Sequence, residues 1–402
     1  MTDPAAGSDP AAFRRALVAL IVGQVCLHGC MAGVRLAAPL QALRQGHAAW
    51  AVGLLMGLFA AAPILLALRT GRLADRHGYH VPMRLAVGLT TAGGLLAAAS
   101  TWLTVLQFPV LCVAATLCGV GANFGLIAIQ RTAGRMTSGS SVELTRVFSW
   151  LGLAPAFSNM VGPVVAGVMI DLSGFRGAFI ALTLLPLLGL WWARRVPQEV
   201  PAPRPAQTGS RTAWDLFTTP GLRRLLLVNW LLSSSWDLHA FVVPILGHER
   251  GFSASAIGLI LGAFAASVAM VRLAIPPLAH RLREGQVLAG AMLVTAAIFI
   301  VYPWAGSAWW MAVCAAMLGL ALGCVQPMIM TTLHQLTPHD RHGEAIALRS
   351  MTINSASALM PLVFGLLGGV IGAGSLFWLM GAAVGAGSFP ARRIRARAPV
   401  RT

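Results

Sequence analysis

One acidic side chain stands out because of where it lies in the sequence. Of the twelve Asp and Glu residues, Asp237 alone falls well inside a long apolar segment, within LLSSSWDLHAF. A charge at the centre of a membrane-spanning helix costs about 2.5 kcal/mol or more, so such a residue normally faces a cavity and has a function. Burial raises the pKa of carboxyl groups in general, which suits a reversible proton carrier. We therefore predict that Asp237 couples a process to protons; the alternative is a carboxylate held by a hydrogen bond or a basic partner.

A second group of polar residues lies in an earlier apolar segment. Gln24, His28 and Arg35 follow one another at spacings of four and seven residues, which places His28 and Arg35 on one stripe of a helix. Arg35 could bind an anionic group through two parallel hydrogen bonds, or neutralise Asp237. His28 titrates near physiological pH and is a second candidate for proton coupling, with hydrogen-bonded packing as the alternative.

Further candidates are weaker, because amides and aromatic rings in helix bundles often bond or pack against neighbouring helices. His239 follows Asp237 by two residues and is a third proton-coupling candidate. The remaining substrate-binding candidates are polar or aromatic side chains within apolar segments, namely Asn123, Trp236, Gln326, Arg349 and Asn354. Arg349 could instead line the inner mouth of the protein or neutralise a nearby loop. The six cysteines lack metal-ligand spacing, so we expect neither a metal site nor a cofactor.

Composition identifies the elements that must position these residues. The chain is 57% hydrophobic and 10% charged, with a mean hydropathy of +0.75, whereas soluble domains carry about a quarter charged residues. Apolar runs of about twenty residues can each cross a bilayer as a helix. The sequence therefore predicts an all-α membrane protein with twelve spans, at about 14–40, 49–69, 84–103, 108–130, 144–170, 177–195, 223–246, 254–275, 286–304, 308–333, 343–371 and 374–391.

The distribution of basic residues predicts the orientation of these spans. All 29 are Arg, and if the N-terminus is inside, 25 of them lie on the inner side. Only Arg44, Arg176 and Arg250 fall outside, with Arg35 within the first span. This asymmetry follows the positive-inside rule, so the net charge of +17 indicates topology and not a nucleic-acid partner. We expect a multi-pass protein of the inner or plasma membrane with both termini cytoplasmic.

The chain divides into two related halves. We predict a cytoplasmic tail over 1–13, a six-helix bundle over 14–195, a linker over 196–222, a second bundle over 223–391 and a basic tail over 392–402. Shifted by 205 residues, 39–61 falls on 244–266 with ten identities in 23 positions, four of them Gly or Pro. Two parallel repeats of this kind imply a pseudo-two-fold axis along the membrane normal and a site between the halves near the midplane.

A charged stretch, GRLADRHGYHVPMR (71–84), interrupts the apolar segments and is expected to be an inner loop between spans two and three. Its residues Gly71, Asp75, Arg76 and Gly78 resemble the signature loop of the major facilitator superfamily, although that family's following basic pair is replaced by Tyr79 and His80. With the twelve spans, the repeat and the central linker, the resemblance to this family of transporters covers essentially the whole chain.

The resemblance implies that this loop is a conformational latch, which packs on the eleventh helix near Glu344 and favours an outward-open state. Glycines permit a tight turn, and a carboxylate such as that of Asp75 suits the unpaired N–H groups of a helix N-terminus. In the sister loop His280 takes the place of Asp75, so we expect a latch in the N-terminal half only. Alternatively, Asp75 and Arg76 merely keep a short loop in water.

The fifth span resembles part of an exporter pattern. Gly162, Pro163 and Gly167 match its small residues and proline, which let helices approach closely and bend. A basic residue that many proton-coupled members carry in the fourth span is Ala115 here. The pattern favours export, while the missing basic residue argues against a simple transfer of the proton antiport mechanism.

These observations predict a secondary active transporter that works by alternating access and is not an enzyme. The expected partners are a small-molecule substrate, protons and the lipid bilayer, and we expect a monomer. We favour efflux of an amphipathic compound or metabolite. A proton-coupled uptake permease for a small organic anion is the alternative, suggested by Arg35 and Arg349, and a lipid flippase is the alternative from another class.

Overall fold

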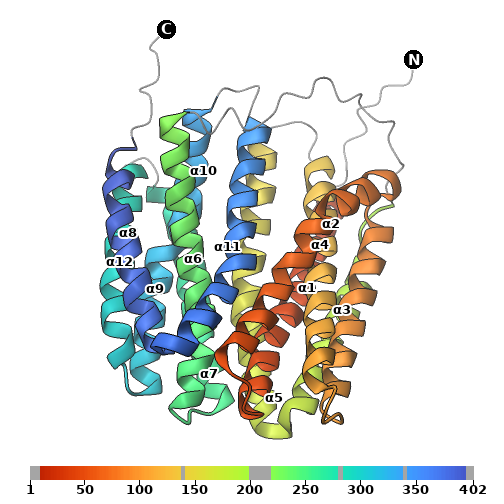
Figure 1. Ribbon diagram of the computed structural model, residues 1–402. Coiled ribbons are helices and arrows are strands. Elements are labelled where there is room, and N and C mark those ends of the chain that lie inside the picture. Colours follow the sequence, from red (N-terminus) through yellow and green to blue (C-terminus); the bar gives the residue numbers. More distant parts are fainter. Residues whose placement is uncertain (1–9, 137–140, 199–218, 279–283, 338–341, 395–402) are drawn as a thin grey trace, which may run out of the picture. The chain divides into compact units, whose positions relative to one another are not determined.

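The computed structural model of the chain describes residues 10–136, 141–198, 219–278, 284–337 and 342–394. These residues form helices joined by short turns, and no strand occurs within those ranges (Figure 1). The predicted all-α fold is confirmed. By its contacts the chain divides into two compact units: the first holds Met1–Arg35 and Ala62–Arg204, and the second holds Leu36–Ala61 and Pro205–Thr402. Residues 36–61 therefore group with the C-terminal half.

The first unit is built from five helices. It contains the first part of α1 (Pro10–Arg44) and the last part of α2 (Ala49–His77), followed by α3 (His80–Ser100), α4 (Gln107–Met136) and α5 (Ser141–Ala193). The long α5 consists of two helices that meet at Gly174, where φ is 72° and the backbone leaves the helical conformation. The fifth and sixth predicted spans are therefore the two parts of α5.

The second unit is also built from helices, and it includes Leu36–Ala61, the end of α1 and the start of α2. It contains α6 (Pro220–Glu249), α7 (Ala254–Leu278), α8 (Glu284–Val301), the short helix η3 (Tyr302–Trp304), α9 (Ala308–Gly323), α10 (Val325–Leu336), α11 (His342–Ile371) and α12 (Ala373–Arg392). The predicted tenth span is divided between α9 and α10, which meet at Cys324.

Ten helical segments of the described chain are long and apolar enough to cross a membrane. One of them, Trp150–Ala193, contains both parts of α5. The 20-residue helix α12 is not among the ten. Apolar helices of this length satisfy their own backbone hydrogen bonds in lipid, and the chain is a multi-pass membrane protein.

The internal repeat is visible in the turns that join the helices. Gly46 and Gly251 lie 205 positions apart, with φ of 82° and 70°. The N–H of Gly46 bonds to Leu43 O at 2.9 Å, and the N–H of Gly251 bonds to His248 O at 3.0 Å. Glycine commonly ends helices in this left-handed conformation. The same turn geometry thus recurs at the offset that the sequence repeat predicts.

The expectation of a loop over residues 71–84 is wrong for most of its length. Helix α2 continues to His77 and α3 begins at His80, because Leu, Ala and Arg are good helix formers even in a polar stretch. The turn itself is short. Gly78 ends α2 with φ of 67° and donates its N–H to Ala74 O at 3.0 Å.

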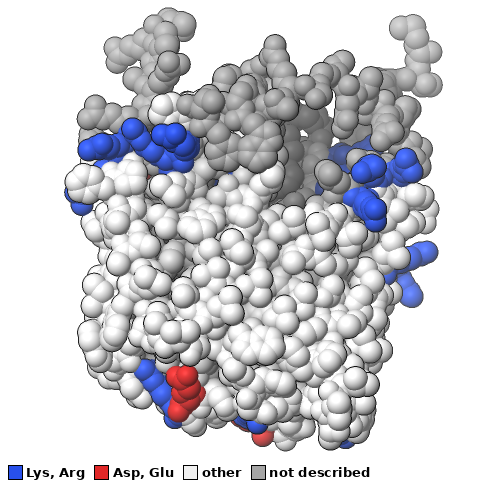
Figure 2. Space-filling view, in the orientation of Figure 1, with Lys and Arg blue, Asp and Glu red and all other residues white. Residues whose placement is uncertain are grey.

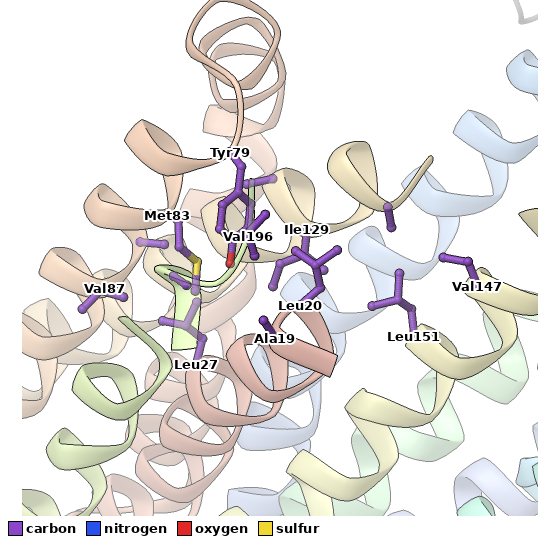
Figure 3. Packing of buried hydrophobic residues seen from close by; sticks show 14 residues of the cluster. Ala19, Leu20, Leu27, Tyr79, Met83, Val87, Ile129, Val147, Leu151 and Val196 are labelled. Carbon is purple, nitrogen blue, oxygen red and sulfur yellow. The ribbon is translucent and has the colours of Figure 1, made fainter. Parts of the chain in front are cut away.

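The residue after this turn, Tyr79, is fully buried in a hydrophobic cluster of the first unit. Figure 3 shows its ring pointing among the apolar side chains of that cluster, beside Met83 and Val196. The next side chain, His80, has its Nε2 3.1 Å from Val196 O. These two residues tie the α2–α3 turn to the segment that follows α5.

Basic side chains gather toward one end of each unit (Figure 2). In the first unit they are exposed at the start of α1, the end of α2, the start of α3 and the ends of α4 and α5, as Arg14, Arg15, Arg72, Arg76, Arg84, Arg135, Arg194 and Arg195. The pattern agrees with the charge asymmetry of the sequence; which end faces the cytoplasm stays a prediction.

Two of the exceptions to that asymmetry have structural contacts. The Arg176 guanidinium lies over the Trp102 ring at 4.1 Å, and its Nε donates to Thr101 Oγ1 at 3.2 Å. In the second unit, Arg250 donates to Pro303 O at 2.6 Å and to Ala305 O, in the connection between α8 and α9. Each arginine therefore holds a helix connection in place.

Candidate functional site

Asp237 lies in the interior of α6, inside a segment apolar enough to span the membrane, and is 3% exposed. The Ser357 hydroxyl of α11 donates a hydrogen bond of 2.9 Å to Asp237 Oδ2. A hydrogen bond to an ionised acceptor is stronger than one between neutral groups. Sequence reasoning missed Ser357, because a lone hydroxyl in a helix carries no pattern that marks it as a partner of a residue 120 positions away.

His239 lies in a tightly packed cluster of the second unit. Its ring stacks on Phe264 with 4.6 Å between centroids, and its Nε2 is 3.1 Å from Tyr302 Oη. The Tyr302 hydroxyl donates to Met311 O at 3.3 Å, so it accepts from Nε2–H of the histidine. This arrangement favours hydrogen-bonded packing as the role of His239, as opposed to proton transfer.

The aromatic candidate beside Asp237 takes part in the same cluster. Trp236 is half-buried and meets Phe264 edge-to-face, with 4.5 Å between ring centroids. Phe264 of α7 therefore contacts both Trp236 and His239 of α6. Asn354, on α11, is exposed.

In the first unit, α1 carries the polar candidates Gln24, His28 and Arg35. Gln24 is 3% exposed, and its Oε1 has no hydrogen-bond partner among the residues that the structure describes. His28 and Arg35 are both half-buried and close enough for their charges to interact. On α4, Asn123 Oδ1 likewise lacks a partner within the described ranges. A buried acceptor without a donor costs about 1–3 kcal/mol, which is a reason to consider both amides as ligand contacts.

A pair of arginines meets within the membrane-spanning part of the second unit. Arg349 of α11 is 7% exposed, and Arg272 of α7 lies close enough for the two positive charges to repel. Arg272 Nη2 donates to Gln326 Oε1 of α10 at 2.8 Å. Sequence reasoning selected Arg349 and Gln326 but counted Arg272 only as an inner-side charge, because it lies near the end of its apolar segment.

The proposed latch lies partly outside the described residues. Arg76 is exposed and Gly78 is buried in the turn, but the placement of Gly71 and of the Asp75 side chain falls outside what the structure describes. The same holds for the first residues of α11, including the side chain of Glu344. The contact between this segment and α11 therefore stays a prediction.

The fifth-helix motif makes a close helix crossing in the first unit. A Cβ added at Gly162 would lie 2.8 Å from Gly33 N and closer still to Gly29 O, so α5 and α1 touch through their backbones. Pro163 and Gly167 are also buried. Close approach of this kind is what small residues allow in membrane helices.

Within the described ranges, no group of three or more His, Cys, Asp or Glu side chains could hold a metal ion. The six cysteines carry free thiols, three of them buried. The polar groups described above are therefore hydrogen-bonding and charged side chains of membrane helices.

Comparison with known proteins gives one family. The sequence profile of the Major Facilitator Superfamily matches residues 20–235 and 225–401. The uncharacterized MFS-type transporter YddS of Bacillus subtilis (strain 168) is 28% identical over 197 residues, which are 48% of this chain and 44% of that protein. YdeG of the same organism, also an uncharacterized MFS-type transporter, is 28% identical over 170 residues, 41% of this chain and 38% of that protein. The chain spans less than half the length of these curated relatives in the matched regions.

Solved structures share the fold. A POT family transporter in complex with a thioalcohol-conjugated peptide superposes with a TM-score of 0.76 at 14% identity, covering 93% of this chain and 95% of the other. The human organic anion transporter MFSD10 superposes with a TM-score of 0.66 at 17% identity, covering 96% of this chain and all of the other.

Proposed function

The chain belongs to the Major Facilitator Superfamily, and from this premise we propose that it moves a small organic molecule across a membrane by secondary active transport coupled to protons. It is a transporter and not an enzyme. Alternating access and proton coupling are typical of the family. The proposal assigns the coupling to named side chains.

The observation that carries the proposal is Asp237, a carboxyl group buried within α6 and hydrogen-bonded to Ser357 of α11. An ionised carboxylate only accepts hydrogen bonds, whereas a protonated one also donates. Proton binding at Asp237 therefore changes its bond to Ser357 and removes a charge from the membrane interior. That change alters the link between α6 and α11, which is how proton binding would bias one conformation over another.

His28 is the second candidate for proton coupling. It lies half-buried on α1 near Arg35, and no hydrogen bond ties its ring within the described part of the chain. His239 ranks third, because its ring is held by Phe264 and Tyr302. A pairing of Arg35 with Asp237 stays a prediction.

The latch belongs to the proposal as well. Asp75 would hold the end of α2 against α11 in one conformation, so Asp75→Asn should slow turnover more than it weakens substrate binding. We expect outward transport of an amphipathic compound, because the latch residues occur in one half of the sequence only and Gly162 matches the exporter pattern.

A second candidate function is uptake of a small organic anion. The buried Arg349 and the half-buried Arg272 of the second unit favour an anionic substrate. A fold neighbour is named an organic anion transporter, but at 17% identity that likeness extends to the fold alone.

Transport by purified protein in sealed vesicles tests the proposal. The panel contains organic anions, cationic dyes and lysolipids, each supplied with and without an imposed pH gradient. We expect at least one small organic compound to move faster with the gradient, in the direction that identifies efflux or uptake. Movement of lysolipids alone would favour the flippase, and movement of no compound would refute secondary transport of such molecules.

A further inference from the structure

Three polar side chains from three different helices meet in the second unit. Arg272 of α7, Gln326 of α10 and Arg349 of α11 each lie in a segment long and apolar enough to span the membrane. Arginine within such a segment costs several kcal/mol unless it is paired or faces water, and it normally marks a functional site. Two arginines side by side therefore require an explanation.

Arg349 is the member of this cluster that lacks hydrogen-bond acceptors. Its side chain is 7% exposed, and its Nε is buried without an acceptor among the described residues. Within the described ranges no hydrogen bond or ion pair reaches this guanidinium, and the positive charge of Arg272 nearby repels it. Arginine keeps its charge in proteins, so burial without an acceptor is costly.

Two carboxylates of the second unit accept hydrogen bonds from residues outside this cluster. Asp237 accepts a hydrogen bond from Ser357, and Glu284 accepts one from Gln335 Nε2 at 3.2 Å. The Gln326 amide already uses its oxygen to accept from Arg272 at 2.8 Å. That bond orients the Arg272 guanidinium and leaves the amide NH₂ of Gln326 as a further donor.

The cluster therefore presents N–H donors and positive charge from both guanidinium groups and the amide. Such a set binds oxygen anions, because a guanidinium matches two oxygens of a carboxylate or phosphate with parallel hydrogen bonds. It would repel a cationic ligand and leave its charges unbalanced around a neutral one.

We propose that Arg272, Gln326 and Arg349 bind the anionic group, a carboxylate or a phosphate, of the transported substrate. This inference rests on the proposed transport function and adds the chemical class of the substrate. It assigns Arg272 and Arg349 to charge recognition and Gln326 to holding Arg272 in position.

Binding measurements on the full chain test this assignment. The protein is placed in nanodiscs of phosphatidylcholine and titrated calorimetrically with phthalate, phenyl phosphate and the neutral benzamide. We expect one or both anions to bind and benzamide not to bind. Arg349→Gln and Arg272→Gln should each weaken anion binding at least tenfold, and Arg349→Lys, which keeps the charge but not the planar fork, should weaken it less.

The matched control is Arg223→Gln, which removes an exposed arginine near the start of α6 in the same unit and should leave binding unchanged. Each variant is first checked for a monodisperse elution profile and a thermal transition. Equal anion binding by wild type and both glutamine variants would overturn the assignment. The assignment would also be overturned if Glu344→Gln fully restored the stability that Arg349→Gln loses, since Arg349 and Glu344 would then form a structural ion pair.

The lipid source of phosphate is distinguished in a separate arm. If nanodiscs that contain phosphatidylglycerol stabilise the protein through Arg349 while soluble anions do not bind, the site is a lipid site and the substrate assignment fails. Arginine-dependent anion binding by a protein that moves no compound in vesicles would refute the transport proposal and leave the anion site standing. Transport that survives both glutamine variants unchanged would refute the anion site alone.

Discussion

Replacing Gly162 by alanine tests whether the close crossing of α1 and α5 holds the first unit together. The added Cβ would lie 2.8 Å from Gly33 N and 3.0 Å from the Ala32 Cβ, whereas ordinary contact begins at 3.4 Å. The two helices must therefore separate by roughly half an ångström or more, and a gap of that size forfeits about a quarter or more of each dispersion contact along the crossing. Over-packing of this kind costs about 1–3 kcal/mol.

Alanine also favours a helix over glycine by about 1 kcal/mol, so we expect a net loss of up to about 2 kcal/mol. The matched control is Gly88→Ala in α3, where the new Cβ meets nothing within 4 Å and stability should rise by up to about 1 kcal/mol. For a unit of this size, 1 kcal/mol shifts Tm by about 2–4 °C. Thermal unfolding in detergent should place the two variants several degrees apart, and equal Tm values would refute the close-crossing argument.

Two other predictions concern single residues of the turns. Burial raises the pKa of the Tyr79 phenol, so its neutral form stabilises the fold below about pH 10 and that contribution is lost as the pH rises further. Tyr79→Phe should therefore match or slightly exceed wild type in Tm at pH 7, because the Tyr79 hydroxyl has no hydrogen-bond partner in the described chain. Above pH 10 the variant should lose less stability than wild type. Parallel curves of Tm against pH for the two proteins would contradict this. Gly251→Ala should lower the free energy of unfolding by about 1–2 kcal/mol, because the φ of Gly251 is 70° although an added Cβ would meet nothing. The control Gly290→Ala in α8, where a Cβ also meets nothing and φ is not positive, should cause no such loss. Equal Tm values for the two variants would refute the strain argument.

Features that depend on local chemistry, such as membrane-spanning helices, can be predicted from the sequence alone. Apolar length predicts helices that cross a membrane, and the turns at Gly46 and Gly251 recur at the 205-residue offset of the sequence repeat. The extension of α2 through residues 71–77 differs from the expected loop, because the Arg, Leu and Ala residues of this polar stretch favour a helix.

The partners of the functional residues could not be predicted. Ser357 reaches Asp237 and Gln326 reaches Arg272 only because distant helices pack together. A single sequence contains no signal for such pairs, since a serine or an amide in a helix looks the same whether it bonds its own backbone or another helix. The grouping of 36–61 with the second unit depends on packing in the same way.

The central claim is that Asp237 carries the proton that drives transport, and its most direct test compares two assays on Asp237→Asn in vesicles. We expect the variant to lose transport driven by a pH gradient while it keeps exchange of labelled for unlabelled substrate, since exchange needs no net proton movement. The exposed acid Asp171 provides the control, and Asp171→Asn should keep both activities. Gradient-driven transport at the wild-type rate in Asp237→Asn would contradict the account.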